Sequence, residues 1–274
     1  MTDLVVRRLL VDMDAPIARH WCAGDPFRTA LFNALSMSFP VGEQFFIDAV
    51  RDGLKALPAA EQERFRAEVQ GFVGQEATHR RLHGLYNAHL ARLGLDNQWD
   101  ARARSQLGLF AGTDVRHALA VTAAHEHFTA IFAEYMLRNP DLLGTDDPRL
   151  ATLWLWHSAE EAEHKTTAFD LYRTLGGNEE WRLVWFRRIT WTFLGELLRQ
   201  TALNLRRDGT LWRWRTWRGA ASFLFGRRGM VRNLYRPWRE YFRADFHPGQ
   251  HDSAASLEWL EANRGQYVPV GAAA

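Results

Sequence analysis

A stripe of histidines and glutamates on an otherwise apolar helical face is the feature that most constrains this chain. Residues 154–172, WLWHSAEEAEHKTTAFDLY, combine large apolar side chains with two histidines and three glutamates, and contain no turn-forming residue. Steps of three and four residues, which keep to one face of a helix, pass through Leu150, Trp154, His157, Glu161, His164, Ala168 and Leu171. Because both ends of this stripe are apolar, His157, Glu161 and His164 are predicted to face the core.

Three other segments repeat this pattern, an apolar stripe interrupted by acidic or imidazole groups. The polar members are Glu43 in residues 41–56, Glu76, His79 and His83 in residues 60–94, and Glu126 in residues 115–138. The stepping leaves Glu160 and Glu163 off the stripe of their own segment, so these two carboxylates are expected to face solvent. Four predicted helices therefore each direct at least one carboxylate into an apolar interior.

Burying such carboxylates without compensation would cost several kcal/mol each. A metal-free network of Glu–His pairs is one way to reduce this cost, but only the histidines could supply positive charge on these stripes. A shared divalent centre would neutralise all four carboxylates at once and give each imidazole an acceptor for its lone pair. The pattern therefore favours a metal site.

The spacing of the stripes strengthens this interpretation, because a glutamate precedes each of two Glu-x-x-His pairs at nearly the same distance. Glu43 lies 33 residues before Glu76-x-x-His79, and Glu126 lies 35 residues before Glu161-x-x-His164. One glutamate from each of two helices and one Glu-x-x-His from each of two others is the ligand pattern of ferritin-like di-iron carboxylate bundles. We therefore predict an all-α, ferritin-like four-helix bundle with a di-metal centre in its core and additional C-terminal helices.

Proline and glycine clusters divide the chain into helical stretches, with no strand-like alternation longer than a few residues. The predicted helices span residues 27–37, 41–56, 60–94, 115–138, 148–175, 180–206 and 229–243. We expect one domain over residues 1–250, consisting of a core at about 41–175 and a helical extension at about 180–245. Residues 251–274 are expected to form a tail.

Composition limits the class of protein further. Cys22 is the only cysteine among 274 residues, which rules out an internal disulfide and a site built from several thiolates. The N-terminus lacks the apolar core of a signal peptide, and no uncharged apolar run reaches 18 residues. The sequence is therefore expected to belong to a cytoplasmic protein, with peripheral membrane contact as a further option.

The membrane option comes from residues 181–243, which contain 15 arginines, seven of the twelve tryptophans and three acidic residues. This segment carries a formal charge of +12, against −10 for the rest of the chain. Three interpretations compete: helices that cover the core, an amphipathic surface for anionic lipid headgroups, and nucleic-acid binding. No nucleic-acid motif accompanies the arginines, so no nucleic-acid partner is expected.

The residues on the stripes also resemble a known family, the bacterial predicted metal-dependent hydrolases grouped with the ferritin-like superfamily. The resemblance lies in LSMSFPVGEQFF (35–46), FVGQEATHRRLH (72–83), TAAHEHFTA (122–130), WHSAEEAEHKTTAFDLY (156–172), HW (20–21) and FHPGQHD near the end. It covers roughly residues 5–252. The resemblance implies a di-metal bundle whose ligands are Glu43, Glu76, His79, Glu126, Glu161 and His164.

The roles within this set are inferred from the geometry of such bundles. Glu76 and Glu161 are expected to bridge two metals and to take part in catalysis, while Glu43 and Glu126 are terminal ligands. The pattern of this chain departs from the minimal one by two further histidines, His83 and His157, each one helical turn from a proposed ligand. These could be additional ligands, proton shuttles or hydrogen-bond partners of the ligands.

Oxygen and nitrogen ligands without thiolate favour two iron ions, with manganese or zinc as alternatives. Our first expectation is an O2-dependent di-iron oxidoreductase acting on a small molecule, because ferritin-like bundles tend toward oxygen chemistry. A metal-dependent hydrolase of esters or phosphates is the second. An iron-storage or metal-binding protein, and an adaptor that uses the metal only structurally, are further alternatives, and a homodimer is compatible with the sequence.

Overall fold

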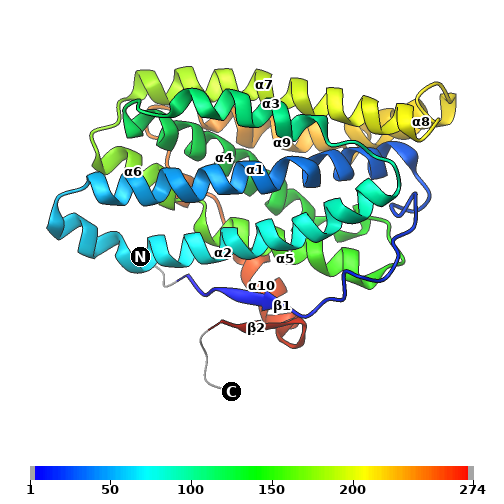
Figure 1. The fold of residues 1–274 in the computed structure, drawn as a ribbon, viewed down its shortest axis with the longest axis horizontal. Helices are drawn as coiled ribbons and strands as arrows, with labels where there is room; N and C mark the ends of the chain where they lie inside the picture. The colour runs from blue at the N-terminus through cyan, green and yellow to red at the C-terminus, as the bar shows by residue number, and fades with distance from the viewer. Residues whose placement is uncertain (1–3, 271–274) are drawn as a thin grey trace.

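The computed structural model describes residues 4–270, and within them helices form almost the entire structure (Figure 1). The helices are α1 (Pro26–Ala56), α2 (Ala59–Arg92), α3 (Gln98–Leu107), α4 (Val115–Arg138), α5 (Pro148–His164), α6 (Thr167–Thr174), α7 (Glu179–Arg207), α8 (Trp214–Phe225), α9 (Met230–Glu240) and α10 (Ala254–Ala262). Two three-residue strands, β1 (Arg7–Leu9) and β2 (Tyr267–Pro269), form the one sheet of the described residues. The predicted all-α class is thus confirmed.

Four helical rods carry the polar stripes and pack together: α1, α2, α4 and the pair α5–α6. The long helix α7 and the shorter helices α3, α8 and α9 cover the side of α1 and α4 that faces away from α2, as the upper layer in Figure 1. The small sheet and α10 lie on the opposite side, against α2 and α5. None of the described helices combines the length and apolarity needed to cross a membrane.

Side-chain caps begin several of these helices where the sequence places them. Asp147 accepts a hydrogen bond from the backbone N–H of Arg149, and Pro148 occupies the first turn of α5. Asp25 caps α1 in the same way ahead of Pro26. The capping carboxylates satisfy N–H groups that have no partner inside the helix. Proline fits at this position because its missing N–H would have been unpaired anyway.

The two predicted helices at 27–37 and 41–56 are a single helix, α1, which continues through Pro40. Proline lacks the N–H that would bond the carbonyl of Ser36. In the structure the side-chain amide of Asn87 donates to that carbonyl at 2.8 Å, so the freed acceptor has a partner on α2. The expectation of a break was wrong because this compensation comes from a residue distant in sequence.

The predicted helix at 148–175 is instead divided into α5 and α6 by a short turn at Lys165 and Thr166. Hydroxyl groups on and beside α10 contact carbonyl groups near the end of α5. Ser256 donates to the carbonyl of Ala159 at 2.7 Å, and Ser253 lies 3.4 Å from the carbonyl of Ala162. These carbonyls of the last turns of α5 are thus satisfied from outside the helix, and Ala168 and Leu171 beyond the turn remain buried.

The expectation of a tail over residues 251–274 was also wrong for the described part. Residues 254–262 form α10, whose Leu260 is buried, and β2 pairs antiparallel with β1 in the register Arg7↔Pro269 and Leu9↔Tyr267. These elements contain too few residues to give a strong periodic signal in the sequence. Elements of this length gain their stability from packing against the rest of the protein. Residues 271–274 lie outside the described part.

Apolar side chains fill the interior on both sides of the polar stripes. On α2, Phe65, Val69 and Phe72 belong to one apolar cluster, whereas Tyr86 and Leu90 belong to another. The polar residues of α2 occupy the turns between these two clusters. The polar groups therefore lie in the middle of the core, where few water molecules could solvate them.

We expect a methyl group at Gly71 to destabilise the fold, because the N-terminal segment lies directly against this part of α2. A Cβ at Gly71 would lie 2.8 Å from the backbone oxygen of Leu4. Gly71→Ala should lower the free energy of unfolding by about 1–3 kcal/mol, measured by urea denaturation.

Gly84→Ala on the same helix is the matched control, because a Cβ there meets no atom within 4 Å. This variant should raise the stability by about 0.5–1 kcal/mol through helix propensity alone. A Gly71→Ala protein as stable as Gly84→Ala would show that the N-terminal segment does not pack on α2.

Candidate metal centre

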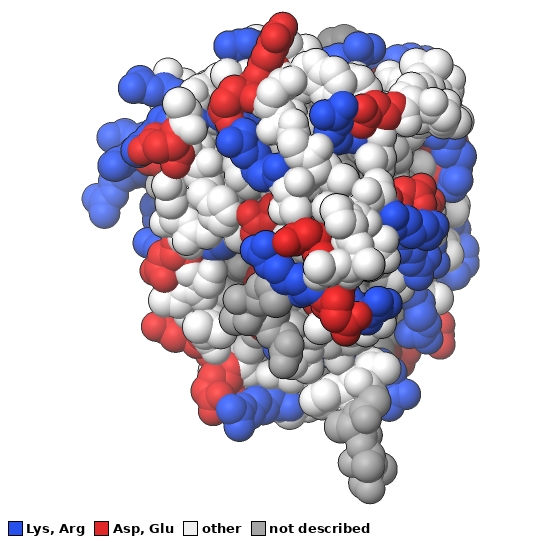
Figure 2. Space-filling model, turned by 90° about the vertical axis from the view of Figure 1, so that its left-hand side faces the viewer, with Lys and Arg blue, Asp and Glu red and all other residues white. Residues whose placement is uncertain are grey.

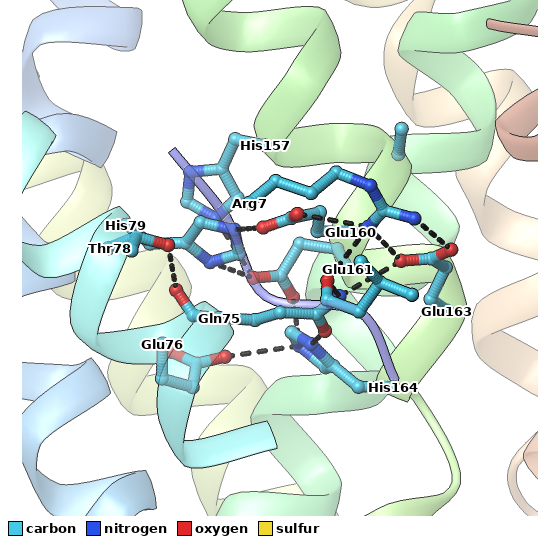
Figure 3. Close-up of polar contacts among 12 residues, drawn as sticks. Arg7, Gln75, Glu76, Thr78, His79, His157, Glu160, Glu161, Glu163 and His164 are labelled. Carbon is cyan, nitrogen blue, oxygen red and sulfur yellow. Dashed lines mark hydrogen bonds and ion pairs between the residues drawn. The ribbon is translucent and has the colours of Figure 1, made fainter. Parts of the chain in front are cut away.

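Seven buried side chains from α1, α2, α4 and α5 converge at the centre of the four rods (Figure 3 shows five of them). They form two groups, Glu43, His79 and His157 in the first, and Glu76, Glu126, Glu161 and His164 in the second. Within each group, one ligand-type atom per residue lies within 4.8 Å of the others. The structure thus brings together all six residues predicted as ligands, and adds His157 to them.

Glu161 lies between the two groups. Its Oε1 is 2.8 Å from Nε2 of His157 and 3.5 Å from Nδ1 of His79, and its Oε2 is 3.6 Å from Nε2 of His164. This position suits a carboxylate shared by two cations. Glu76, which was also expected to bridge, belongs to the second group, where its Oε1 lies 3.0 Å from Nε2 of His164.

The donor atoms of these groups fit metal ions because most of them lack any other partner. Among the described residues, both carboxylate oxygens of Glu43, Glu76 and Glu126 are buried without a hydrogen bond, as are Nδ1 of His79 and Nε2 of His164. The short contact between His164 and Glu76 is not aligned as a hydrogen bond. Buried polar atoms in proteins are nearly always paired, so unpaired acceptors that face one another form a site suited to cations.

Burial also determines the charge of these carboxyl groups when no cation is bound. It is the largest of the effects that raise the pKa of Glu43, Glu76 and Glu126, and the neighbouring carboxylates raise these pKa values further. Each of these groups therefore holds a proton more tightly than an exposed carboxyl group does. A divalent ion would take the place of the protons, so binding is coupled to proton release.

Each of the three histidines in the groups has its outer ring nitrogen held by a buried partner. His79 places Nε2 3.0 Å from Glu160, His164 places Nδ1 2.9 Å from Gln75, and His157 places Nδ1 2.8 Å from Nε2 of His83. With a single proton on the outer nitrogen, the inner nitrogen of each ring would present a lone pair to a bound cation. Histidines that bind metals are characteristically oriented in this way.

The expectation that Glu160 faces solvent was wrong. Its side chain is completely buried between His79 and Arg7, whose Nη1 lies 3.0 Å from Oε1 of Glu160 (Figure 3). Arg7 also forms an ion pair of 2.6 Å with Glu163, which is mostly buried as well. Burial lowers the pKa of His79, but the contacts with the carboxylates of Glu160 and Glu161 outweigh it and raise that pKa to about 10.

Helical stepping could not find Arg7, because this residue lies on a short strand far from the polar stripes in sequence. Gln75 and Glu160 each directly precede a predicted ligand in the chain. Adjacency to a ligand was the one available signal for them, since a side chain beside a ligand can reach around the helix to a neighbouring histidine.

His83 lies outside both groups and acts on His157 instead. Burial lowers the pKa of His83 well below its usual value, so the ring is neutral and Nε2 can accept a hydrogen bond from His157. Its Nδ1 then donates to Ser36 at 2.8 Å, and the Ser36 hydroxyl donates to Asn87 at 2.8 Å. Every donor in this chain of hydrogen bonds has an acceptor, which fixes the tautomer of both histidines.

A largely apolar cavity of about 470 Å³ extends from the centre to the surface. Glu43, His157 and Glu161 line its inner end, whereas the remaining four members of the two groups do not line it. Phe39 lies against the ring of His157 at a centroid distance of 4.8 Å and forms part of the wall. The first group therefore faces the cavity, and most of the second group is enclosed.

Comparison with known proteins gives one match. A family model described as "Predicted metal-dependent hydrolase" matches residues 5–252, which is most of the chain. No curated protein and no solved structure matches it. The placement in the ferritin-like superfamily therefore remains a prediction.

Removing the imidazole of His83 is expected to weaken metal binding although no proposed metal ligand is changed. In His83→Leu, the Nδ1–H of His157 loses its acceptor, so the affinity for the first bound divalent ion should fall by about 10–100-fold. Competition titration with a chromophoric chelator measures this change.

His125→Leu is the matched control, because His125 is a half-buried histidine of the same four rods that packs against Phe46 and Phe193 and belongs to neither group. The affinity of this variant should equal that of the wild type. His83→Gln, whose amide oxygen can accept from His157, should recover part of the loss. Equal affinities for all three variants would contradict the role of His83.

Proposed function

Because the chain belongs to the predicted metal-dependent hydrolase family, we propose that it is a two-metal hydrolase acting on an apolar small molecule. The observation that supports this function is the meeting of the apolar cavity with Glu43, His157 and Glu161. The cavity volume of about 470 Å³ lies in the range of ordinary ligand sites. A substrate in it would place its reacting group beside the first group of ligands.

The two groups define which residues would hold each ion. Glu43, His79 and His157 would hold one, Glu76, Glu126 and His164 the other, and Glu161 would contact both. When bound, such a pair of ions supplies Lewis acidity and a water molecule with a lowered pKa. Carboxylate and imidazole donors without thiolate fit iron, manganese or zinc.

The environments of the two groups divide their roles. Most of the second group is enclosed by protein, and three of its four members are carboxylates. The first group has fewer charged donors and faces the cavity through Glu43 and His157. Catalytic metal sites keep a position open to substrate, whereas structural sites are closed. The reaction is therefore assigned to the first group.

The other residues of the site position the ligands and bind the substrate. Glu160, Gln75 and His83 orient the three imidazoles, and the ion pair of Arg7 with Glu160 keeps that carboxylate in place. The apolar walls bind the apolar part of the substrate and exclude water from the reacting group. Apolar atoms form most of the cavity surface, which favours esters of apolar alcohols or acids over phosphates of polar ones.

An O2-dependent oxidation is the second candidate, and the donor set favours it. Four carboxylates and three imidazoles match the oxygen- and nitrogen-rich sites of di-iron enzymes. An apolar cavity beside the first group would also suit the oxidation of an unactivated substrate. Storage of iron would not require this cavity, and a purely structural ion would not require one group to be open to it.

Anaerobic turnover of carboxylic esters separates the two reactions. Protein purified without added metal is first analysed for its metal content, and then reloaded with manganese, zinc or iron. We expect the loaded protein to hydrolyse nitrophenyl esters of medium-chain acids without oxygen, and Phe39→Trp, which narrows the cavity beside His157, to reduce kcat/KM for long acyl chains more than for acetate.

The opposite result identifies the second candidate. Oxygen uptake by the reduced iron form, together with no ester turnover under anaerobic conditions, would exclude hydrolysis. Equal effects of Phe39→Trp on long and short chains would contradict binding of the apolar part in this cavity.

Removing Glu161 is expected to lower the occupancy of both ions. Glu161→Ala takes away the one carboxylate that borders both groups, so metal analysis after dialysis should find less than one tightly bound ion per chain. Glu126→Ala should lose only the ion of the second group and retain about one ion per chain.

Glu68→Gln provides the control, because Glu68 is a buried glutamate of α2 that bonds Thr167 and belongs to neither group. Its metal content should equal that of the wild type. Two ions per chain in Glu161→Ala would refute the shared role of Glu161.

A further inference from the structure

The outer surface of α7, α8 and α9 exposes large apolar side chains to an unusual degree. Trp191 on α7 is 75% exposed and Tyr235 on α9 56%, and Trp212, in the turn between α7 and α8 that belongs to the same surface, is 90% exposed. Further exposed apolar residues on these elements are Leu194, Leu198, Trp214, Trp217, Phe225 and Val231. Figure 1 shows α7 along one edge of the molecule with α8 near one end of it, on the side away from α2 and the sheet. We call this surface the α7–α9 face.

The same elements carry a concentrated positive charge. Residues 181–243 include 15 arginines and three acidic residues. Nine of these arginines have no ion-pair partner within residues 4–270: Arg187, Arg188, Arg206, Arg213, Arg215, Arg218, Arg227, Arg232 and Arg239. By contrast, Figure 2 shows basic and acidic side chains interspersed at one end of the molecule. The charge of this face is therefore left for a partner to balance.

The cavity of the metal centre opens on this face. Trp191 and Leu194 of α7 and Val231 and Tyr235 of α9 line the cavity and are also exposed, so they form its mouth. A hydrogen bond of 3.2 Å from Trp238 to Thr190 joins the two helices beside this mouth. An apolar path thus leads from the exposed aromatic residues to Glu43 and His157.

We propose that the α7–α9 face binds the surface of an anionic lipid bilayer. Arginine-rich helices with exposed tryptophans bind at such surfaces, because guanidinium groups attract anionic headgroups while indole rings enter the interface. A folded acidic protein could balance the charge, but it would close the mouth. A bilayer balances the charge and also presents an apolar phase to the open cavity.

This orientation extends the proposed function by naming a class of substrate. The substrate class rests on the proposed function, whereas the docking does not. A molecule that reaches the mouth from a bilayer is a lipid with an extended apolar chain. Its chain would occupy the cavity, and its polar group would reach the first group of ligands. The binding of the bilayer itself does not depend on metal or on the reaction.

Vesicle flotation with the full chain tests the docking. The protein is mixed with vesicles of phosphatidylcholine alone, or of equal parts phosphatidylcholine and phosphatidylglycerol, at low and at high salt. We expect flotation only with the anionic vesicles, and less of it at high salt. Equal recovery with neutral vesicles, or none with anionic ones, would overturn the proposal.

Charge reversal beside the mouth and away from it gives matched variants. Arg188→Glu/Arg232→Glu changes two unpaired arginines of the α7–α9 face, whereas Arg51→Glu/Arg81→Glu changes two exposed ones on α1 and α2. The first should lower vesicle partitioning by at least about 30-fold, since each basic residue at the surface contributes about 1 kcal/mol. The second should leave it within about threefold of the wild type. Equal losses in both would contradict the assigned face.

Exposed apolar residues provide a second pair. Trp212→Ala should reduce flotation, whereas Leu257→Ala, at an exposed position of α10, should not. If light scattering shows that Arg188→Glu/Arg232→Glu instead converts a dimer into a monomer, or if the wild type binds duplex DNA more tightly than anionic vesicles, the bilayer is not the partner and the proposal fails.

Turnover separates the docking from the reaction. The Arg188→Glu/Arg232→Glu variant should hydrolyse a long-chain ester embedded in anionic vesicles at least about tenfold more slowly than the wild type, with less change for the same ester in neutral micelles. Wild-type flotation without any turnover would leave the docking standing and refute the proposed function. Turnover of the vesicle ester by this variant at the wild-type rate would overturn entry from the bilayer.

Discussion

The repulsion among buried carboxylates from four helical rods is the constraint on which this structure depends. Glu43, Glu76, Glu126 and Glu161 meet where the apolar clusters on both sides exclude water, and most of their oxygens lack a hydrogen bond within the described residues. Their mutual repulsion and desolvation would oppose the packing of the very helices that carry them. Protons can relieve this cost, but divalent ions would relieve it while keeping each carboxylate in its observed direction. The stability of the fold is therefore coupled to the binding of cations at the metal centre.

The helical pattern allowed the centre to be predicted because its residues repeat with the period of a helix. Glu76 and His79, for example, lie one turn apart and face the same way, so no tertiary information was needed to group them. The continuation of α1 through Pro40 and the burial of Glu160 could not be predicted in this way. Both depend on partners distant in sequence, the amide of Asn87 and the guanidinium of Arg7. Periodicity in the sequence shows which side chains share one face of a helix, but it does not show which residues of other elements contact them.

The asymmetry of the two ligand groups connects the centre with the surface. The second group contains three carboxylates and is mostly enclosed by protein, whereas the first group faces an apolar cavity that ends between α7 and α9. The sequence placed the arginines and tryptophans of these helices in one segment, and three explanations remained open for them. The helices of this segment do cover α1 and α4, but Trp191, Trp214 and Trp217 remain exposed, which supports the proposed lipid surface. A surface of this kind would join the source of an apolar substrate to the place where it would react.

The support of His79 extends beyond the part of the chain that the family model matches. Arg7 holds Glu160 against His79, and β1, which carries Arg7, pairs with β2 at residues 267–269, after the match ends at residue 252. The ring of Tyr267 also lies 5.4 Å from the guanidinium of Arg7. Burial of this guanidinium would be unfavourable without the carboxylates of Glu160 and Glu163. Burial of these carboxylates would likewise be unfavourable without the guanidinium. The pairing of the two strands therefore serves to bring a compensating charge to the outer side of the centre, so that the terminal segments contribute to the geometry of a ligand they do not touch.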